Sequence, residues 1–149
     1  MDLIEKSEDV YIIGHKNTDI DCIGAAVGIY KICKHLGKQA NIIVDSRYNN
    51  STRMVIDKLQ AEADYDGVFL TKDDLKKLDF ENSLLVVVDT HKESYLAVTD
   101  IADKFDKKVI IDHHRRGPEF IEDSILTYHE VYASSTSELV TELLMYIED

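Results

Sequence analysis

Length, composition and charge already exclude several classes of protein. The chain has 149 residues, 44% of them hydrophobic and 31% charged, which is enough for one globular domain with a hydrophobic core. No apolar run approaches the roughly 20 residues that span a bilayer, and a formal net charge of −12 argues against binding duplex nucleic acid through its phosphates.

Short β-branched runs recur along the chain and predict the strands of a sheet. Apolar runs without polar alternation are typical of strands buried on both faces of a parallel sheet. Helical patterns lie between them, so we expect an α/β fold with a doubly wound, mostly parallel sheet of about five strands and helices on both faces. A weaker sixth run lies around residues 125–131. The clear runs are Val10–Ile13, Ile42–Val44, Val68–Leu70, Leu84–Val88 and Val109–Ile111.

The first long helix is expected between Cys22 and Leu36, where apolar residues recur at helical spacing, with Gly37 as its stop. Cys22 and Cys33 lie eleven residues apart and share one face of this helix, so both are expected to pack inward. This cysteine usage fits a reducing compartment, and the first residues do not resemble a signal peptide. We therefore expect a soluble chain in the cytoplasm.

The remaining helices are expected in the second half of the chain and around residue 60. The last one is clearest, because Ser135 is a suitable N-cap with Glu138 as its capping-box partner. Its apolar stripe runs to the end of the chain, which predicts a cut through a longer protein. Thr71 is the expected N-cap of a shorter helix. The other expected helices are residues 51–62, 72–78 and 95–105.

Acidic and imidazole side chains follow three of the predicted strands at the point where each strand ends. In an open α/β sheet, ligands bind in the crevice outside the carboxyl ends of the strands. If these three strands are parallel, the polar side chains converge at one edge of the sheet. They are His15, Asp19 and Asp21 after the first run, Asp89, Thr90 and His91 after the fourth, and Asp112, His113 and His114 after the fifth.

Five of these residues together predict a metal site. Carboxylate and imidazole ligands suit Mn²⁺, Zn²⁺, Fe²⁺ or Co²⁺, and with more water Mg²⁺. So many ligands exceed one tetrahedral ion and suit two ions about 3.5–4 Å apart that share a carboxylate. Each residue alone has a simpler explanation, since an aspartate after a strand is often a turn residue or helix cap. The five are His15, Asp19, Asp21, Asp89 and His113.

Four stretches of the chain carry a recognisable pattern of motifs. GHKNTDID, VVVDTH and IIDHHRRG resemble, in order and spacing, the motifs of the DHH phosphoesterase family. With ASSTSELVTELL, the resemblance narrows to the GdpP-type cyclic-di-AMP phosphodiesterases of Gram-positive bacteria and covers nearly the whole chain. The stretches are Gly14–Asp21, Val86–His91, Ile110–Gly117 and Ala133–Leu144.

The resemblance implies a role for each matched residue. Asp112 is expected to support the metal ligands, and His114 and Arg115 to face the scissile phosphate. Four further residues are candidates for binding the phosphate. For three of them the alternative role is capping of a helix, and for the fourth it is a solvated loop position. These four are Ser134, Ser135 and Thr136, and Arg116. The implied metal ligands are His15 and Asp19 for the first manganese, Asp21 and His113 for the second, and Asp89 as the bridge.

The reaction that the resemblance implies is hydrolysis of cyclic-di-AMP to linear pApA with two Mn²⁺ ions. The family has a further metal-binding aspartate and a substrate-gripping DHHA1 lobe, and neither is found before Asp149. Residues 1–149 are therefore expected to be a truncated DHH domain with weak or no turnover. The intact protein is expected to be anchored in the membrane, with this domain in the cytoplasm and out of contact with the bilayer, and could form a homodimer.

Alternative functions stay open from the sequence. One is another DHH hydrolase, either a nuclease of the nanoRNase or RecJ type or a manganese pyrophosphatase. Others are an inactive nucleotide-binding module and a receiver-like signalling domain, although the latter does not explain His15 or the His113–His114 pair. Thr18 and Cys22 depart from the family pattern, where Pro and a small Ala or Ser are common, and neither is expected to touch a ligand atom.

Overall fold

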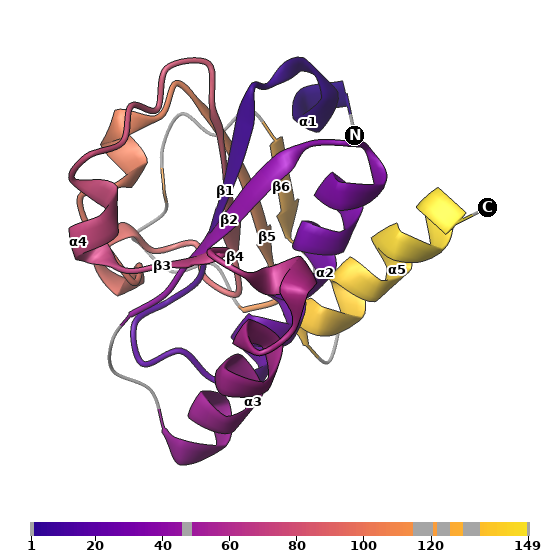
Figure 1. Ribbon diagram of the computed structural model, residues 1–149. Helices are drawn as coiled ribbons and strands as arrows, with labels where there is room; N and C mark the ends of the chain where they lie inside the picture. Colours follow the sequence, from indigo (N-terminus) through magenta and orange to yellow (C-terminus); the bar gives the residue numbers. More distant parts are fainter. Residues whose placement is uncertain (1, 46–48, 115–120, 122–125, 130–134, 149) are drawn as a thin grey trace.

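The parallel sheet predicted from the sequence is present. The computed structural model describes residues 2–45, 49–114, 121, 126–129 and 135–148. In these residues six strands form one sheet, every neighbouring pair parallel, in the order β3-β2-β1-β4-β5-β6 (Figure 1). The weak sixth run is thus a strand and adds one to the five clear runs. The strands are β1 (Asp9–Ile13), β2 (Gln39–Ile43), β3 (Phe69–Leu70), β4 (Leu84–Val88), β5 (Lys107–Asp112) and β6 (Leu126–His129).

Helices cover both faces of the sheet, which confirms the doubly wound arrangement. Figure 1 shows α2, α3 and α5 on one side of the sheet and α4 on the other. None of the helices within the described ranges is long and apolar enough to cross a membrane. The helices are α1 (Asp2–Lys6), α2 (Ile20–His35), α3 (Asn50–Gln60), α4 (Lys72–Leu75) and α5 (Thr136–Glu148), with 3-10 turns η1 (Ala63–Tyr65), η2 (Glu93–Tyr95) and η3 (Ala102–Lys104).

The central strand β4 shows why an unbroken apolar run forms a strand here. All of its residues are buried, because Val86 and Val88 contribute to the core under α2 and α5, while Leu85 and Val87 contribute to the core under η3. Such a strand has no solvent-facing side and needs no polar alternation. Both predicted cysteines are also buried and unpaired, as expected from their shared helix face.

Two helix predictions were wrong in extent or kind. The helix expected over residues 72–78 ends at Leu75, although Thr71 does form a capping box with Asp74. Residues 95–105 contain no α-helix, only the 3-10 turns η2 and η3. The reason is tertiary, because the backbone here pairs with the end of β1: Ala97 N–H donates to the Gly14 carbonyl at 2.9 Å.

Helices α2 and α5 approach each other closely at two glycines of α2. A Cβ added to Gly28 would lie 2.3 Å from Cγ1 of Val140, and one added to Gly24 would lie 2.8 Å from Oγ of Ser137. Both distances are shorter than real Cβ contacts. The missing side chains therefore allow α5 to lie directly on α2, which brings the first turn of α5 to the carboxyl edge of the sheet.

The chain order of the strands reverses between β1 and β4. From β1 the sheet continues through β2 to β3 on one side and from β4 through β5 to β6 on the other. Such a switch point opens a crevice outside the carboxyl ends of the strands, where α/β proteins bind ligands.

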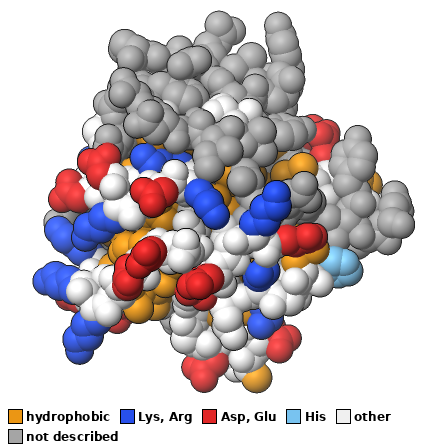
Figure 2. Space-filling model, turned by 90° about the horizontal axis from the view of Figure 1, so that it is seen from above, with side chains coloured by type: hydrophobic (Ala, Val, Ile, Leu, Met, Phe, Trp, Pro, Cys, Tyr) orange, Lys and Arg blue, Asp and Glu red, His pale blue; other side chains and the backbone are white. Residues whose placement is uncertain are grey.

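Figure 2 shows the opposite edge of the sheet, where the strands begin. On this face Lys and Arg side chains are interspersed with Asp and Glu.

Candidate metal centre

His15 lies directly after β1, beside the switch point, and its ring is fixed from both sides. Its Nδ1 lies 2.8 Å from the carbonyl oxygen of Lys16 and its Nε2 lies 3.0 Å from Oδ2 of Asp89. The backbone around it is held by an isolated bridge to Leu96. A ring whose Nδ1–H donates to a carbonyl presents Nε2 as its free ligand atom, which is the usual arrangement of a metal-binding histidine.

Asp89, the residue after β4, points its two carboxylate oxygens in different directions. Oδ2 faces His15, while Oδ1 lies 3.5 Å from Nε2 of His113 and accepts a 2.9 Å hydrogen bond from the Thr136 hydroxyl. The side chain is only 3% exposed, and its backbone has a φ of 64°, in the left-handed region. One carboxylate thus separates two imidazoles, each facing its own oxygen, which is the geometry of a bridging ligand.

Asp21 belongs to the first turn of α2, and its carboxylate lies against the start of α5. Its carboxylate accepts hydrogen bonds from the backbone N–H groups of Ser137 at 3.1 Å and Thr136 at 3.4 Å. Its Oδ2 lies 3.9 Å from Nε2 of His113. The positive end of a helix stabilises a carboxylate in this position. Asp21 therefore stays ionised beside the second imidazole.

Asp19 has the capping function that the sequence left open. It is the N-cap of α2, and its Oδ1 accepts from the Cys22 N–H at 2.9 Å. The same oxygen lies 3.7 Å from Nε2 of His15. About half of the Asp19 side chain is exposed, so its carboxylate lies at the mouth of the site. Capping and metal binding are therefore both within its reach.

Asp112, at the end of β5, holds the following loop. It is fully buried, and it accepts from the Nδ1–H groups of His91 at 2.6 Å and His114 at 2.7 Å. The backbone N–H groups of His113 and His114 donate to it as well. The rings of His113 and His114 lie 4.2 Å apart, so the position of each depends on Asp112.

His91 has no role predicted from the sequence. It is 2% exposed and, with His15, Asp89 and His114, lines a cleft of about 340 Å³ at the carboxyl edge. Its position after a strand that ends at Asp89 was the available signal. The missing information was its partner, since the contact with Asp112 joins residues 21 positions apart.

The charges in this site are unbalanced. Burial raises the pKa of Asp89 despite the hydrogen bond from His15, and the nearby Asp21 charge raises it further. The hydrogen bond to Asp89 in turn raises the pKa of His15 to about 9. Burial opposes ionisation of Asp21 too, but its hydrogen bonds from Ser137 lower its pKa. A buried carboxylate beside a second, ionised carboxylate is costly unless positive charge neutralises the pair.

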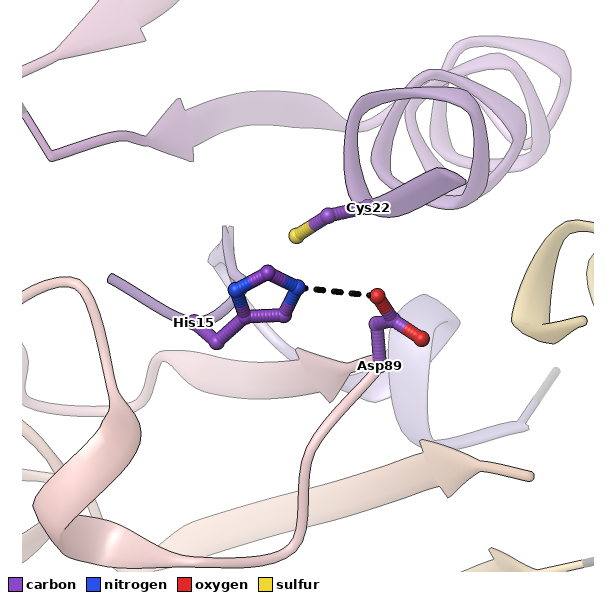
Figure 3. Close-up of side chains that lie close together, drawn as sticks. All are labelled: His15, Cys22 and Asp89. Carbon is purple, nitrogen blue, oxygen red and sulfur yellow. Dashed lines mark hydrogen bonds and ion pairs between the residues drawn. The ribbon is translucent and has the colours of Figure 1, made fainter. Parts of the chain in front are cut away.

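Two groups of donor atoms in the described residues could hold metal ions, and they share Asp89. One consists of His15, Cys22 and Asp89, and the other of Asp89, His113 and His114, with all donor atoms of a group within 4.8 Å of one another. Figure 3 shows the first group, with Cys22 on α2 above the hydrogen-bonded His15 and Asp89. Mixed imidazole and carboxylate donors fit first-row divalent ions. The residues present therefore fit such ions.

The family of the chain follows from comparison with known proteins. The family model described as DHH family, N-terminal domain, matches residues 9–149. The chain belongs to the DHH family. Over 146 residues, 97% of its length, it is 41% identical to the cyclic-di-AMP phosphodiesterase GdpP of Bacillus subtilis, and it covers 22% of that relative. It therefore spans about a fifth of the length of this curated DHH protein.

More distant comparisons agree with the DHH assignment. The chain is 27% identical over 106 residues to a probable manganese-dependent inorganic pyrophosphatase of Enterococcus faecalis, covering 71% of this chain and 31% of that protein. The crystal structure of an exopolyphosphatase-related protein from Bacteroides fragilis matches with a TM-score of 0.75 at 24% identity, over 97% of this chain and 41% of that one. This structural likeness supports the fold alone.

The predicted convergence of the strand ends is confirmed, since His15, Asp89 and His113 lie within hydrogen-bonding or ion-pair distance. Thr136 donates to Asp89 and Ser135 caps α5 by accepting from Glu138 N–H at 3.1 Å, so their predicted phosphate contacts stay predictions. Arg115, Arg116 and Ser134 lie outside the described residues. Cys22 was not expected to touch a ligand atom, and its sulfur lies within 4.8 Å of donor atoms of His15 and Asp89.

Proposed function

We propose that this chain is the metal-binding part of a phosphodiesterase that opens cyclic-di-AMP to linear pApA, using two divalent ions, most simply Mn²⁺. The observation that carries the proposal is the placement of Asp89 between two imidazoles, with Oδ2 toward His15 and Oδ1 toward His113. The similarity to GdpP supports the substrate, and the similarity to a manganese-dependent pyrophosphatase supports the metal.

The residues of the site would divide the work of holding the ions. His15 and Asp19 would bind the first ion, Asp21 and His113 the second, and Asp89 both. When bound, the two ions supply Lewis-acid activation of the phosphate and a hydroxide nucleophile at neutral pH.

The remaining groups would orient and neutralise the substrate. His114 is half exposed at the cleft and its Nδ1 is held by Asp112, and its Nε2 would bind the phosphate or protonate the departing 3′ oxygen. Arg115 would stabilise negative charge on the phosphate oxygens, with Arg116 beside it. Ser134, Ser135 and Thr136 would add contacts near the start of α5.

The context of the domain is also part of the proposal. The intact protein would hold this domain in the cytoplasm below a membrane anchor and close the cleft with the DHHA1 lobe. Without that lobe, and without the further metal-binding aspartate of the family, residues 1–149 should turn over cyclic-di-AMP weakly or not at all. Turnover near that of the two-lobed protein would contradict this expectation.

The direct test is hydrolysis by the intact two-lobed protein of cyclic-di-AMP, pApA, single-stranded DNA and pyrophosphate, side by side with Mn²⁺. We expect cyclic-di-AMP to be the best substrate. Asp89→Asn should lower its turnover at least about 100-fold, because it removes a ligand of both ions. Asp57→Asn, at an exposed position of α3, is the matched control and should have no effect. Unchanged turnover in Asp89→Asn would overturn the proposal, and preference for pyrophosphate would favour a pyrophosphatase instead.

A further inference from the structure

Cys22 lies beside the candidate metal ligands His15 and Asp89, and the proposed function assigns it no role. It is in the first turn of α2, directly after Asp21, and it is 2% exposed. Its sulfur occupies the space left by the missing side chain of Gly14, where an added Cβ would lie 1.8 Å from Sγ. The glycine at the end of β1 thus makes room for the sulfur beside the residue that carries the imidazole.

The sulfur of Cys22 lies beside donor atoms of His15 and Asp89, two residues that are already candidate metal ligands. A ring nitrogen of His15, a carboxylate oxygen of Asp89 and Sγ of Cys22 all lie within 4.8 Å of one another (Figure 3). Donors around a tetrahedral ion with sulfur and nitrogen ligands are about 3.5 Å apart. The three atoms therefore need to move inward by little more than an ångström, within about the reach of side-chain rotation.

A fourth donor is available beside these three. Oδ1 of Asp19 lies 3.7 Å from Nε2 of His15, and the backbone N–H of Cys22 donates to the same oxygen. Asp19 and Cys22 are therefore tied to one another at the start of α2. Zinc binds nitrogen, sulfur and carboxylate oxygen donors of this kind, and expansion to five-coordination would leave a position for water or substrate.

We propose that Cys22 gives the first metal position a sulfur ligand, so that this position takes a thiophilic divalent ion such as Zn²⁺, Co²⁺ or Cd²⁺ in preference to Mn²⁺. The inference rests on the proposed two-metal site and names the ion preference of one half of it. The sulfur binds as thiolate, and its proton passes to solvent as the sulfur–metal bond forms. Soft thiolate ligands favour zinc-like ions, whereas the carboxylates and imidazoles alone suit manganese.

The alternative is that Cys22 is only a packing residue, and Cys33 shows what that looks like. Cys33 lies on the same helix, is completely buried in the core and belongs to neither donor group of the described residues. A family pattern in which Ala or Ser is common at the position of Cys22 is also consistent with packing. Cys33→Ser is therefore the matched control for Cys22→Ser, because both changes put a hydroxyl in place of a buried thiol.

The test titrates the reduced chain with Co²⁺ alone and follows sulfur-to-cobalt charge-transfer absorption. The wild type and Cys33→Ser should show this absorption, and Cys22→Ser should lack it. In equilibrium binding, Cys22→Ser should weaken Zn²⁺ at least about tenfold and Mn²⁺ less than about threefold. The absorption persisting in Cys22→Ser, or equal losses for Zn²⁺ and Mn²⁺, would overturn the inference.

A second measurement needs no variant and covers the case in which Cys22→Ser does not fold. X-ray absorption at the zinc edge of the wild-type chain should show a sulfur neighbour at about 2.3 Å. A shell of only nitrogen and oxygen would overturn the sulfur ligand while the proposed function stands, provided Mn²⁺ still binds. Failure of the wild type to bind any divalent ion would overturn both.

Discussion

The ends of β4 and β5 look alike in sequence and differ in their chemistry. The apolar strand β4 is followed by Asp89, and the apolar strand β5 ends in Asp112. Both aspartates are almost completely buried. Asp112 accepts from two histidine rings and two backbone N–H groups, and despite burial these bonds lower its pKa. Asp89 faces another carboxylate, and burial raises its pKa.

This difference separates a structural carboxylate from one that binds a ligand. The protein itself satisfies Asp112, whose negative charge orients His91 and His114. Asp89 forms a hydrogen bond with one imidazole, that of His15, and accepts one from the Thr136 hydroxyl. It also lies close enough to Asp21 for the two charges to repel. A buried carboxylate that lacks sufficient positive charge is a site for cations. The environment, more than the residue type, therefore identifies the ligand.

The largest expected effect is on metal binding at Asp89. Asp89→Asn should weaken Mn²⁺ binding by more than about 100-fold, because loss of a direct ligand exceeds the cost of losing a supporting contact. Above about pH 9, where His15 has lost its proton, the metal-free fold of Asp89→Asn should be no less stable, since a repelled buried charge is removed and asparagine tolerates the left-handed backbone. Calorimetric titration and thermal unfolding without metal measure the two effects. A clear loss of metal-free stability above that pH would contradict the difference drawn between Asp89 and Asp112.

The opposite pattern is expected at Asp112. Asp112→Asn should destabilise the metal-free fold by about 2 kcal/mol, because the amide cannot accept from both imidazole N–H groups that converge there. Urea unfolding without metal measures this loss. Mn²⁺ binding should weaken by only about 10-fold, as for a residue that orients ligands. If Asp112→Asn abolished binding as fully as Asp89→Asn, the two aspartates would not differ in role.

The pH dependence of the site should follow His15. Its pKa of about 9 lies above the usual 6.5, so its contribution to metal-free stability is complete below pH 6.5 and is lost as the pH rises through about 9. A metal ion must displace this proton, so Mn²⁺ affinity should rise by up to about tenfold per pH unit in the same window. Titrations at several pH values measure the slope. In Asp89→Asn the metal-free stability should change less over this range, because the strongest of the partners that raise the His15 pKa is gone.

The smallest expected effect concerns the hydroxyl that supports Asp89. Thr136→Val removes the hydrogen bond to Oδ1 at nearly constant volume and should cost about 1 kcal/mol of stability. Thr141→Val, one turn further along α5, removes an exposed hydrogen bond to the Ser137 carbonyl and should cost much less. Chemical denaturation of both variants compares them directly, and equal losses would contradict a role for Thr136 at the site.

The strand ends could be predicted from the sequence because burial on both faces leaves an unmistakable apolar run, and the polar residues that follow it must lie at one edge. The hydrogen-bond partners and charges around each of these polar residues could not be predicted from the sequence. The pairing of His91 with Asp112 and the position of Cys22 against Gly14 join segments that only the folded sheet brings together. Residues 95–105 illustrate the same limit, since a pattern that predicts a helix is overridden by backbone pairing with the end of β1.

The close contact of α2 with α5 has a mechanical consequence. Helix α5 has 13 residues, so it is a stiff rod of about 20 Å whose first turn bonds Asp21 and Asp89. The helix lies directly against α2 at Gly24, beside that turn, and at Gly28, one turn further along. Because the same first turn bonds both carboxylates, any movement of α5 relative to α2 would also shift Asp21 and Asp89.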